Sequence, residues 1–161
     1  MLLVLMFGIL AIYVEASPLG LGPDAPPSPD LLLCVIVFWA LRRPEATPML
    51  LVFTIGIMRD LLTDVPVGAG ALSLVLIAEV FKAYRRVLAR TNFLYEWLAF
   101  ATAAIAGTVF VWALVILTFA QPPYLTNLLH QCLYSAMIYP FIVLVMRWVL
   151  RIGWSRVEVP V

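Results

Sequence analysis

Three short clusters of basic residues lie between long apolar stretches of this sequence. Nine of the ten Lys and Arg residues fall in these clusters, and the other connections carry almost none. A chain that crosses a bilayer repeatedly shows this alternation, because the loops left in the cytoplasm are enriched in Lys and Arg. The pattern therefore predicts a membrane protein with several crossings. The clusters are Arg42 and Arg43; Lys82, Arg85, Arg86 and Arg90; and Arg147, Arg151 and Arg156.

The composition excludes a soluble domain. Of the 161 residues, 65% are hydrophobic and 12% are charged, and the mean hydropathy is +1.07, whereas about a quarter of the residues of a soluble domain are charged. No polar stretch is long enough for a second domain, so we expect a single transmembrane helical domain over residues 1–161 and no nucleic acid as partner. Cys34 and Cys132 lack CxxC spacing and are interpreted as small core residues.

Six apolar segments predict an all-α polytopic membrane protein with about six transmembrane helices. A straight crossing needs roughly twenty residues, and the first four segments are shorter. These segments must include flanking residues, lean on neighbouring helices or thin the bilayer. The segments are residues 2–14, 30–41, 48–62, 67–81, 93–120 and 128–150.

The first apolar segment resembles a secretory signal only in part. It ends in Val14-Glu15-Ala16, an imperfect cleavage pattern, and it has no basic residue before the apolar run. Because signal peptides carry that charge, we interpret the segment as a retained first helix.

Alternation from the basic turn at Arg42 and Arg43 predicts the orientation of the chain. Residues 17–30 carry five prolines and no Lys or Arg, so this loop is expected outside, together with 62–66 and 120–127. Residues 82–92 and the C-terminal tail are then inside. Both termini are expected in the cytoplasm.

Two Pro-containing turns predict where helices begin. In Ser28-Pro29-Asp30, the serine is expected as N-cap, the proline at the first helical position and the acid in the first turn. Thr47-Pro48 repeats the first two of these features. Both prolines are therefore expected to start helices.

Two glutamates near the predicted inner boundary have structural explanations. Glu79 lies three residues before Lys82, which favours an ion pair on one helix face. Glu96 follows Asn92 at the start of the fifth segment, where an acidic side chain suits the positive end of the helix dipole.

Asp60 is harder to explain, because an ionised side chain at membrane depth is costly and is a functional candidate by default. Arg59 is its expected neutralising partner, in a paired helix end that leads into the turn at Pro66 and Gly68. The alternative is a carboxylate pair of Asp60 and Asp64, four residues apart, that binds a cation or relays protons.

Small residues recur every four positions in the fifth segment, at Ala99, Ala103 and Gly107. In lipid, such a face lets helix backbones approach closely. It serves either packing within the bundle or contact with a separate protein.

No catalytic or metal-binding pattern is recognisable. His130 is the single histidine, and no nucleophile with a base, phosphate-binding glycine loop or HExxH motif is present. We therefore expect a protein that is not an enzyme and has no cofactor or metal site.

Four short motifs in residues 29–75 together resemble the MreD family of bacterial rod-shape-determining proteins. The similarity is weaker in the second half, where only size, number of segments and basic loops agree. The motifs are Pro29-Asp30-Leu31-Leu32-Leu33, Trp39-Ala40-Leu41-Arg42-Arg43-Pro44, Gly56-Ile57-Met58-Arg59-Asp60-Leu61-Leu62 and Pro66-Val67-Gly68.

The resemblance implies a non-enzymatic component of the cell-elongation machinery in the inner membrane. MreD-like proteins work with MreC in an assembly that links MreB filaments to peptidoglycan synthesis by RodA and its penicillin-binding partner. Their fold is similar to that of the vitamin-binding subunits of energy-coupling-factor transporters, so a subunit of such a transporter is the alternative function. Structural or partner-facing roles are expected for Gly56, Asp60, Pro66, Gly68, Ala99, Ala103 and Gly107.

Overall fold

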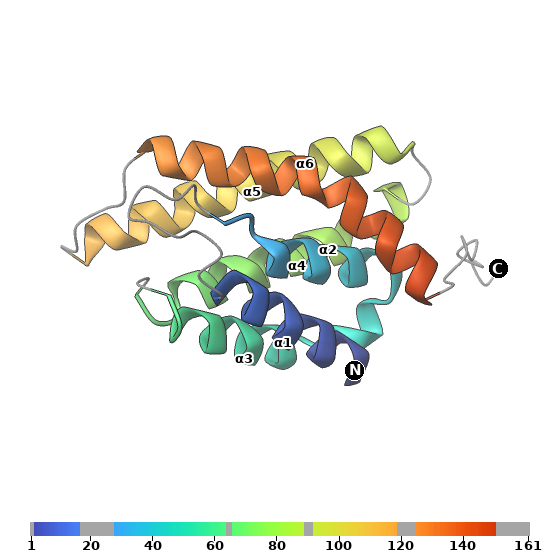
Figure 1. The fold of residues 1–161 in the computed structure, drawn as a ribbon, viewed down its shortest axis with the longest axis horizontal. Coiled ribbons are helices and arrows are strands. Elements are labelled where there is room, and N and C mark those ends of the chain that lie inside the picture. Colours follow the sequence, from blue (N-terminus) through green and yellow to red (C-terminus); the bar gives the residue numbers. More distant parts are fainter. Residues whose placement is uncertain (1, 17–27, 64–65, 89–91, 119–124, 151–161) are drawn as a thin grey trace.

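The computed structural model describes residues 2–16, 28–63, 66–88, 92–118 and 125–150, which form six α-helices and one short 3-10 helix, η1 (Figure 1). Each predicted apolar segment contains most of one α-helix. The helices are α1 (Leu2–Ala16), α2 (Leu31–Arg42), η1 (Pro44–Ala46), α3 (Met49–Asp60), α4 (Ala69–Leu88), α5 (Phe93–Leu117) and α6 (Leu125–Leu150).

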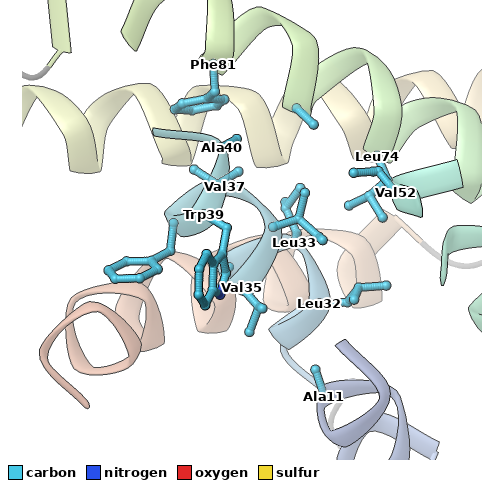
Figure 2. Packing of buried hydrophobic residues seen from close by; sticks show 14 of the residues in the cluster. Ala11, Leu32, Leu33, Val35, Val37, Trp39, Ala40, Val52, Leu74 and Phe81 are labelled. Carbon is cyan, nitrogen blue, oxygen red and sulfur yellow. The ribbon is translucent and has the colours of Figure 1, made fainter. Parts of the chain in front are cut away.

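Helix α2 occupies the centre of the bundle. Helices α1 and α3 lie on one side of α2 and α4, and α5 and α6 lie on the other (Figure 1). Every residue of α2 from Leu32 to Ala40 is buried. Figure 2 shows the packing of this helix, with Ala11 of α1 near Leu32 and Phe81 of α4 near Ala40. This short apolar helix thus lies at the centre of the core.

Two helices of the described part are long and apolar enough to cross a membrane. They cover Phe93–Leu117 and Asn127–Val149. Helices α1 and α2 are apolar but shorter, and α3 has only 12 residues. Together with the composition, this architecture is that of a helical membrane protein.

The start of α2 differs from the prediction, because Asp30 and not Ser28 is the N-cap. The Asp30 carboxylate accepts a hydrogen bond of 2.9 Å from the backbone N–H of Leu33. The helix begins only at Leu31, so the acidic side chain takes the capping position expected for the serine.

The start of α3 also differs. Thr47 was expected to cap this helix, but its hydroxyl donates to the carbonyl oxygen of Pro44 at 3.1 Å, and Pro48 occupies the N-cap position without a side-chain hydrogen bond. The turn η1 places the Pro44 carbonyl beside the threonine, where it also accepts from the Thr47 backbone N–H at 3.2 Å. This local acceptor competes successfully with the helix.

Two glycines allow close approach of neighbouring helices. A Cβ atom added at Gly56 would lie 2.6 Å from Cα of Ala71, so the backbones of α3 and α4 are in contact. A Cβ atom at Gly107 would lie 2.7 Å from Cδ1 of Ile77 and 2.9 Å from Oγ of Ser73, where α5 crosses α4. Ala99 and Ala103 are partly buried against the same core, so this face of α5 packs inside the bundle.

Candidate functional site

Asp60 ends α3 and caps the start of α4. Its side chain is buried, and Oδ2 accepts hydrogen bonds from the backbone N–H groups of Gly68 at 2.9 Å and Ala71 at 3.0 Å. Ala71 lies in the first turn of α4 and Gly68 directly precedes that helix. Backbone N–H groups at a helix start have no partner within the helix. The carboxylate therefore joins α3 and α4 across the connecting turn.

The sequence of that turn fits this arrangement. Gly68 has a φ angle of +97°, a conformation that residues with a side chain rarely adopt. The backbone N–H of Ala69 donates to the carbonyl oxygen of Pro66 at 3.0 Å. Gly70 leaves room for the Asp60 carboxylate, because a Cβ atom there would collide with it. The Pro-x-Gly motif thus shapes the turn around Asp60.

The predicted pairing of Arg59 with Asp60 is wrong. Arg59 forms ion pairs with Glu15, at 3.1 Å from Nε to Oε2, and with Asp30, at 3.0 Å from Nη2 to Oδ2. The Asp60 carboxylate instead accepts its hydrogen bonds from backbone N–H groups at the start of α4. The alternative pair with Asp64 falls on a residue outside the described part of the chain.

Glu15, Asp30 and Arg59 form a charged triad where three helices meet. Oε1 of Glu15 accepts a hydrogen bond of 2.8 Å from the backbone N–H of Leu32, so the end of α1 caps the start of α2. The side chains of Arg59 and Glu15 are only 17% and 6% exposed. The triad therefore ties α1, α2 and α3 together in a largely buried setting.

Helix α6 reaches the triad through Ser135. The backbone N–H of Asp30 donates to the Ser135 hydroxyl oxygen at 2.7 Å, and this hydroxyl donates to the carbonyl oxygen of Gln131 at 2.7 Å. A buried serine thus connects the start of α2 to the middle of α6.

A second polar cluster lies at the other end of α2. Glu96 accepts two hydrogen bonds from Arg42, of 3.1 and 3.2 Å, and one of 2.7 Å from the hydroxyl of Tyr139. The Arg42 guanidinium lies 4.5 Å from the centre of the Phe38 ring, and Phe100 stacks on Tyr139 at 4.1 Å. The bidentate ion pair of Arg42 and Glu96 orients both charged groups and joins α2 to α5. The Tyr139 hydroxyl adds α6 to this cluster.

The predicted pair of Glu79 and Lys82 is confirmed, with 2.7 Å between Oε1 and Nζ. Lys82 also donates to the backbone carbonyl oxygen of Thr47. Asp60, Glu79 and Glu96 thus make separate contacts and form no common site.

The two clusters were partly missed by reasoning from the sequence. Glu15 was considered only as part of a cleavage pattern, and Glu96 only as a first-turn acid. Arg59 is the one basic residue outside the three clusters, and Glu15 is the acid that directly follows the first apolar segment. Since a lone charge at membrane depth calls for an opposite partner, these two isolated charges were the available signal.

The described side chains offer no evident metal centre. No group of three or more His, Cys, Asp and Glu residues in the described ranges is arranged to hold a metal ion. Cys34 and Cys132 are both free thiols, and Cys34 is buried in the core as expected. The carboxylates of the two clusters are engaged by N–H groups, Arg side chains and a tyrosine hydroxyl.

The comparison with protein families decides the identity. The family model of the rod shape-determining protein MreD matches residues 1–156. The chain belongs to the MreD family. Neither a curated protein nor a solved structure matches it. As an MreD-family member it is a rod shape-determining membrane protein. The motifs on which the sequence resemblance rests contain Asp30, Arg42, Gly56, Asp60 and Gly68, all of which make the contacts described above.

Proposed function

We propose that this MreD-family protein is a non-enzymatic inner-membrane scaffold of the cell-elongation machinery. In this proposal it binds MreC and so links MreB filaments to peptidoglycan synthesis by RodA and its penicillin-binding partner. The observation that carries the proposal is the family match over residues 1–156. The buried charged groups make contacts that hold the helices together, which supports a scaffold role.

We further propose that the chain crosses the inner membrane six times with both termini in the cytoplasm. The number of α-helices supports six crossings. The end of α2 that carries Arg42 and Arg43 is then cytoplasmic, and the triad lies toward the outside. Single cysteines in a background without Cys34 and Cys132 test this orientation. Cysteines at positions 25 and 121 should react with an impermeant thiol reagent from outside, and one at Ala46 should be protected; reversed labelling would contradict the topology.

The turn between α3 and α4 is proposed as the element that faces the partner. Gly56, Asp60 and Gly107 are buried, so they act by shaping the bundle. Leu61, Leu62 and Val67 are exposed in the connection between α3 and α4 and supply the contact surface.

Two variants test the role of this turn. Asp60→Asn removes the charge that caps α4, and Gly68→Leu forces a side chain into a positive-φ position. We expect both variants to insert into the membrane but to recover less MreC in pull-down experiments. Normal insertion with full MreC recovery in both would exclude the turn as the partner-facing element.

The likeness to vitamin-binding subunits of energy-coupling-factor transporters stays a prediction about the fold. A vitamin site needs several polar groups that converge on one pocket. Within the described ranges, Asp60 instead caps the start of α4, whereas Glu96 belongs to the cluster at the Arg42 end of α2, and each is engaged in internal contacts. We therefore favour the scaffold.

A test in cells separates these functions. Depletion of the protein in its host should turn rod-shaped cells into wider or spherical ones, and the wild-type chain should restore the rod. Unchanged cell width, together with stoichiometric binding of a small ligand by the purified protein, would overturn the proposal in favour of transport.

A further inference from the structure

We propose that the bilayer is thinner along the face of the protein formed by α1 and α3 than along the face formed by α5 and α6. This inference rests on the proposed membrane-spanning topology. The interaction partner is the lipid bilayer itself, whose headgroups and water approach the bundle more deeply on one side.

The lengths of the helices on the two faces differ strongly. Helix α1 has 15 residues and α3 has 12, about 22 and 18 Å at 1.5 Å per residue. Helices α5 and α6 have 25 and 26 residues, about 37 and 39 Å. The hydrocarbon core of a typical bilayer is about 30 Å thick. Tilting can fit a helix that is too long, but not one that is too short.

Both faces are apolar and open to their surroundings. Met6 and Leu10 of α1 are exposed, as are Ile105 and Val109 of α5. These two faces lie on opposite sides of α2 and α4 (Figure 1). Acyl chains fit both surfaces, so the difference between them lies in the height of the apolar band.

Charged groups mark the outer ends of the short helices. Glu15 closes the last turn of α1, and Arg59 lies one residue before the end of α3. The side chains of Arg59 and Asp30 keep 17% and 20% of their surface exposed. Exposed charge in contact with hydrocarbon is costly, and a locally thinned bilayer with penetrating water relieves this cost.

The hydrogen bond between Asp30 and Ser135 fixes the depth of the triad. Ser135 lies ten residues after Leu125, the first residue of α6, a distance of about 15 Å along the helix. If the bilayer had the same thickness all around the protein and covered the whole of α6, the triad would lie in hydrocarbon. If the lipid headgroups lie closer to the bilayer centre beside α1 and α3, the triad stays near water.

Nitroxide labels on lipid-facing positions test the proposal. The full chain, with Cys34→Ala and Cys132→Ser, is reconstituted in vesicles of dioleoyl phosphatidylcholine and dioleoyl phosphatidylglycerol. Collision rates with oxygen, which concentrates in hydrocarbon, are compared with those of a water-soluble nickel complex present on both sides. The labelled positions are the exposed residues Leu3, Met6, Leu10 and Val14 on α1 and Leu98, Ile105, Val109 and Ile116 on α5.

We expect a short apolar band on α1 and a long one on α5. Labels at Met6 and Leu10 should favour oxygen, whereas labels at Leu3 and Val14 should collide several-fold more often with the nickel complex. Labels from Leu98 to Val109 should all favour oxygen. Water contact at both ends of α1 distinguishes a thin bilayer from a tilt of the whole protein, which would expose only one end.

Each other outcome overturns the inference in a distinct way. Oxygen preference at both Leu3 and Val14 would mean a bilayer of uniform thickness and would leave the six-span topology intact. Nickel contact at only one end of α1 would mean tilt. Nickel contact at Val109 together with Val14 would mean that the outer parts of α5 and α6 stand in water. Nickel contact at all four α1 positions would contradict the proposed topology itself.

Discussion

The carboxylate of Asp60 fills the space that a side chain at Gly70 would need. An added Cβ atom would lie 3.1 Å from Cγ of Asp60 and would collide with one of its oxygens. We predict that Gly70→Ala displaces the carboxylate from its N–H donors and lowers the free energy of unfolding by about 1–3 kcal/mol. Unfolding in mixed micelles with increasing SDS measures this change.

Gly8→Ala is the matched control for this prediction. Its added Cβ would lie 3.3 Å from Cδ1 of Ile55, the end of a side chain that can move. We expect a cost below about 1 kcal/mol. Equal costs for the two variants would contradict the role assigned to Gly70.

Substitutions of Asp60 separate its hydrogen bonds from its charge. Asp60→Asn keeps an oxygen that can accept from Gly68 and Ala71, and it loses about 0.3–1 kcal/mol of interaction with the helix dipole. Asp60→Ala leaves both donors without their partner and should cost about 1–3 kcal/mol. The same SDS unfolding series should therefore rank wild type above Asn and Asn above Ala. Equal stability of the two variants would exclude capping.

Arg42 and Glu96 should be coupled strongly, because both lie in a mostly buried cluster. Arg42→Met removes the bidentate partner of the Glu96 carboxylate and should cost about 3–5 kcal/mol, as breaking a buried pair does. The double variant with Glu96→Leu should recover much of this loss. Additive costs in the double-mutant cycle would contradict the coupling.

Glu79→Ala provides the comparison for an exposed pair. The Glu79 side chain is 46% exposed, so its pairing with Lys82 should contribute no more than about 1 kcal/mol. A cost as large as that of Arg42→Met would show that burial does not determine the contribution of these pairs.

Arg59 should not be replaceable by lysine. Its Nε and Nη2 atoms contact Glu15 and Asp30 separately, whereas a lysine ammonium is a single point of contact on a flexible chain. Arg59→Lys should therefore lower thermal stability in detergent, and Arg59→Met should lower it further. Adding Glu15→Gln to Arg59→Met should restore part of the loss by removing an unpaired charge. No rescue would contradict the triad.

Gly56 should tolerate alanine less well than Gly107. At Gly56 the added Cβ meets backbone of Ala71, which cannot move alone, and overpacking of this kind costs about 1–3 kcal/mol. At Gly107 it meets Cδ1 of Ile77 and Oγ of Ser73, which can rotate away. Ile77→Val should rescue Gly107→Ala in heat-inactivation experiments. The reverse ranking of the two glycines would contradict the described helix contacts.

Local patterns in the sequence predicted much of the fold. The apolar segments indicated the helices, and the spacing of Glu79 and Lys82 indicated their ion pair, because these features depend on neighbours within one helix. The buried thiol of Cys34 followed from its place in an apolar run. The motifs of the resemblance contain Asp60 and Gly68, which the structure joins by a hydrogen bond.

Contacts between distant residues escaped prediction. Arg42 and Glu96 are 54 positions apart and meet only because α2 ends beside the start of α5. Arg59 pairs with Glu15 rather than with adjacent Asp60, because the helix N–H groups of α4 already satisfy Asp60. The sequence shows which charges need partners, whereas the packing of the helices decides which partners they find.

Crosslinking in living cells tests the proposed scaffold most directly. A photoreactive amino acid at Leu62, in the exposed turn between α3 and α4, is activated in cells that carry the tagged full-length chain. The products are purified from the membranes and identified. The scaffold proposal predicts a crosslink to MreC and recovery of RodA with its penicillin-binding partner. Recovery of paired ATPases with a coupling membrane subunit, and no MreC, would contradict it.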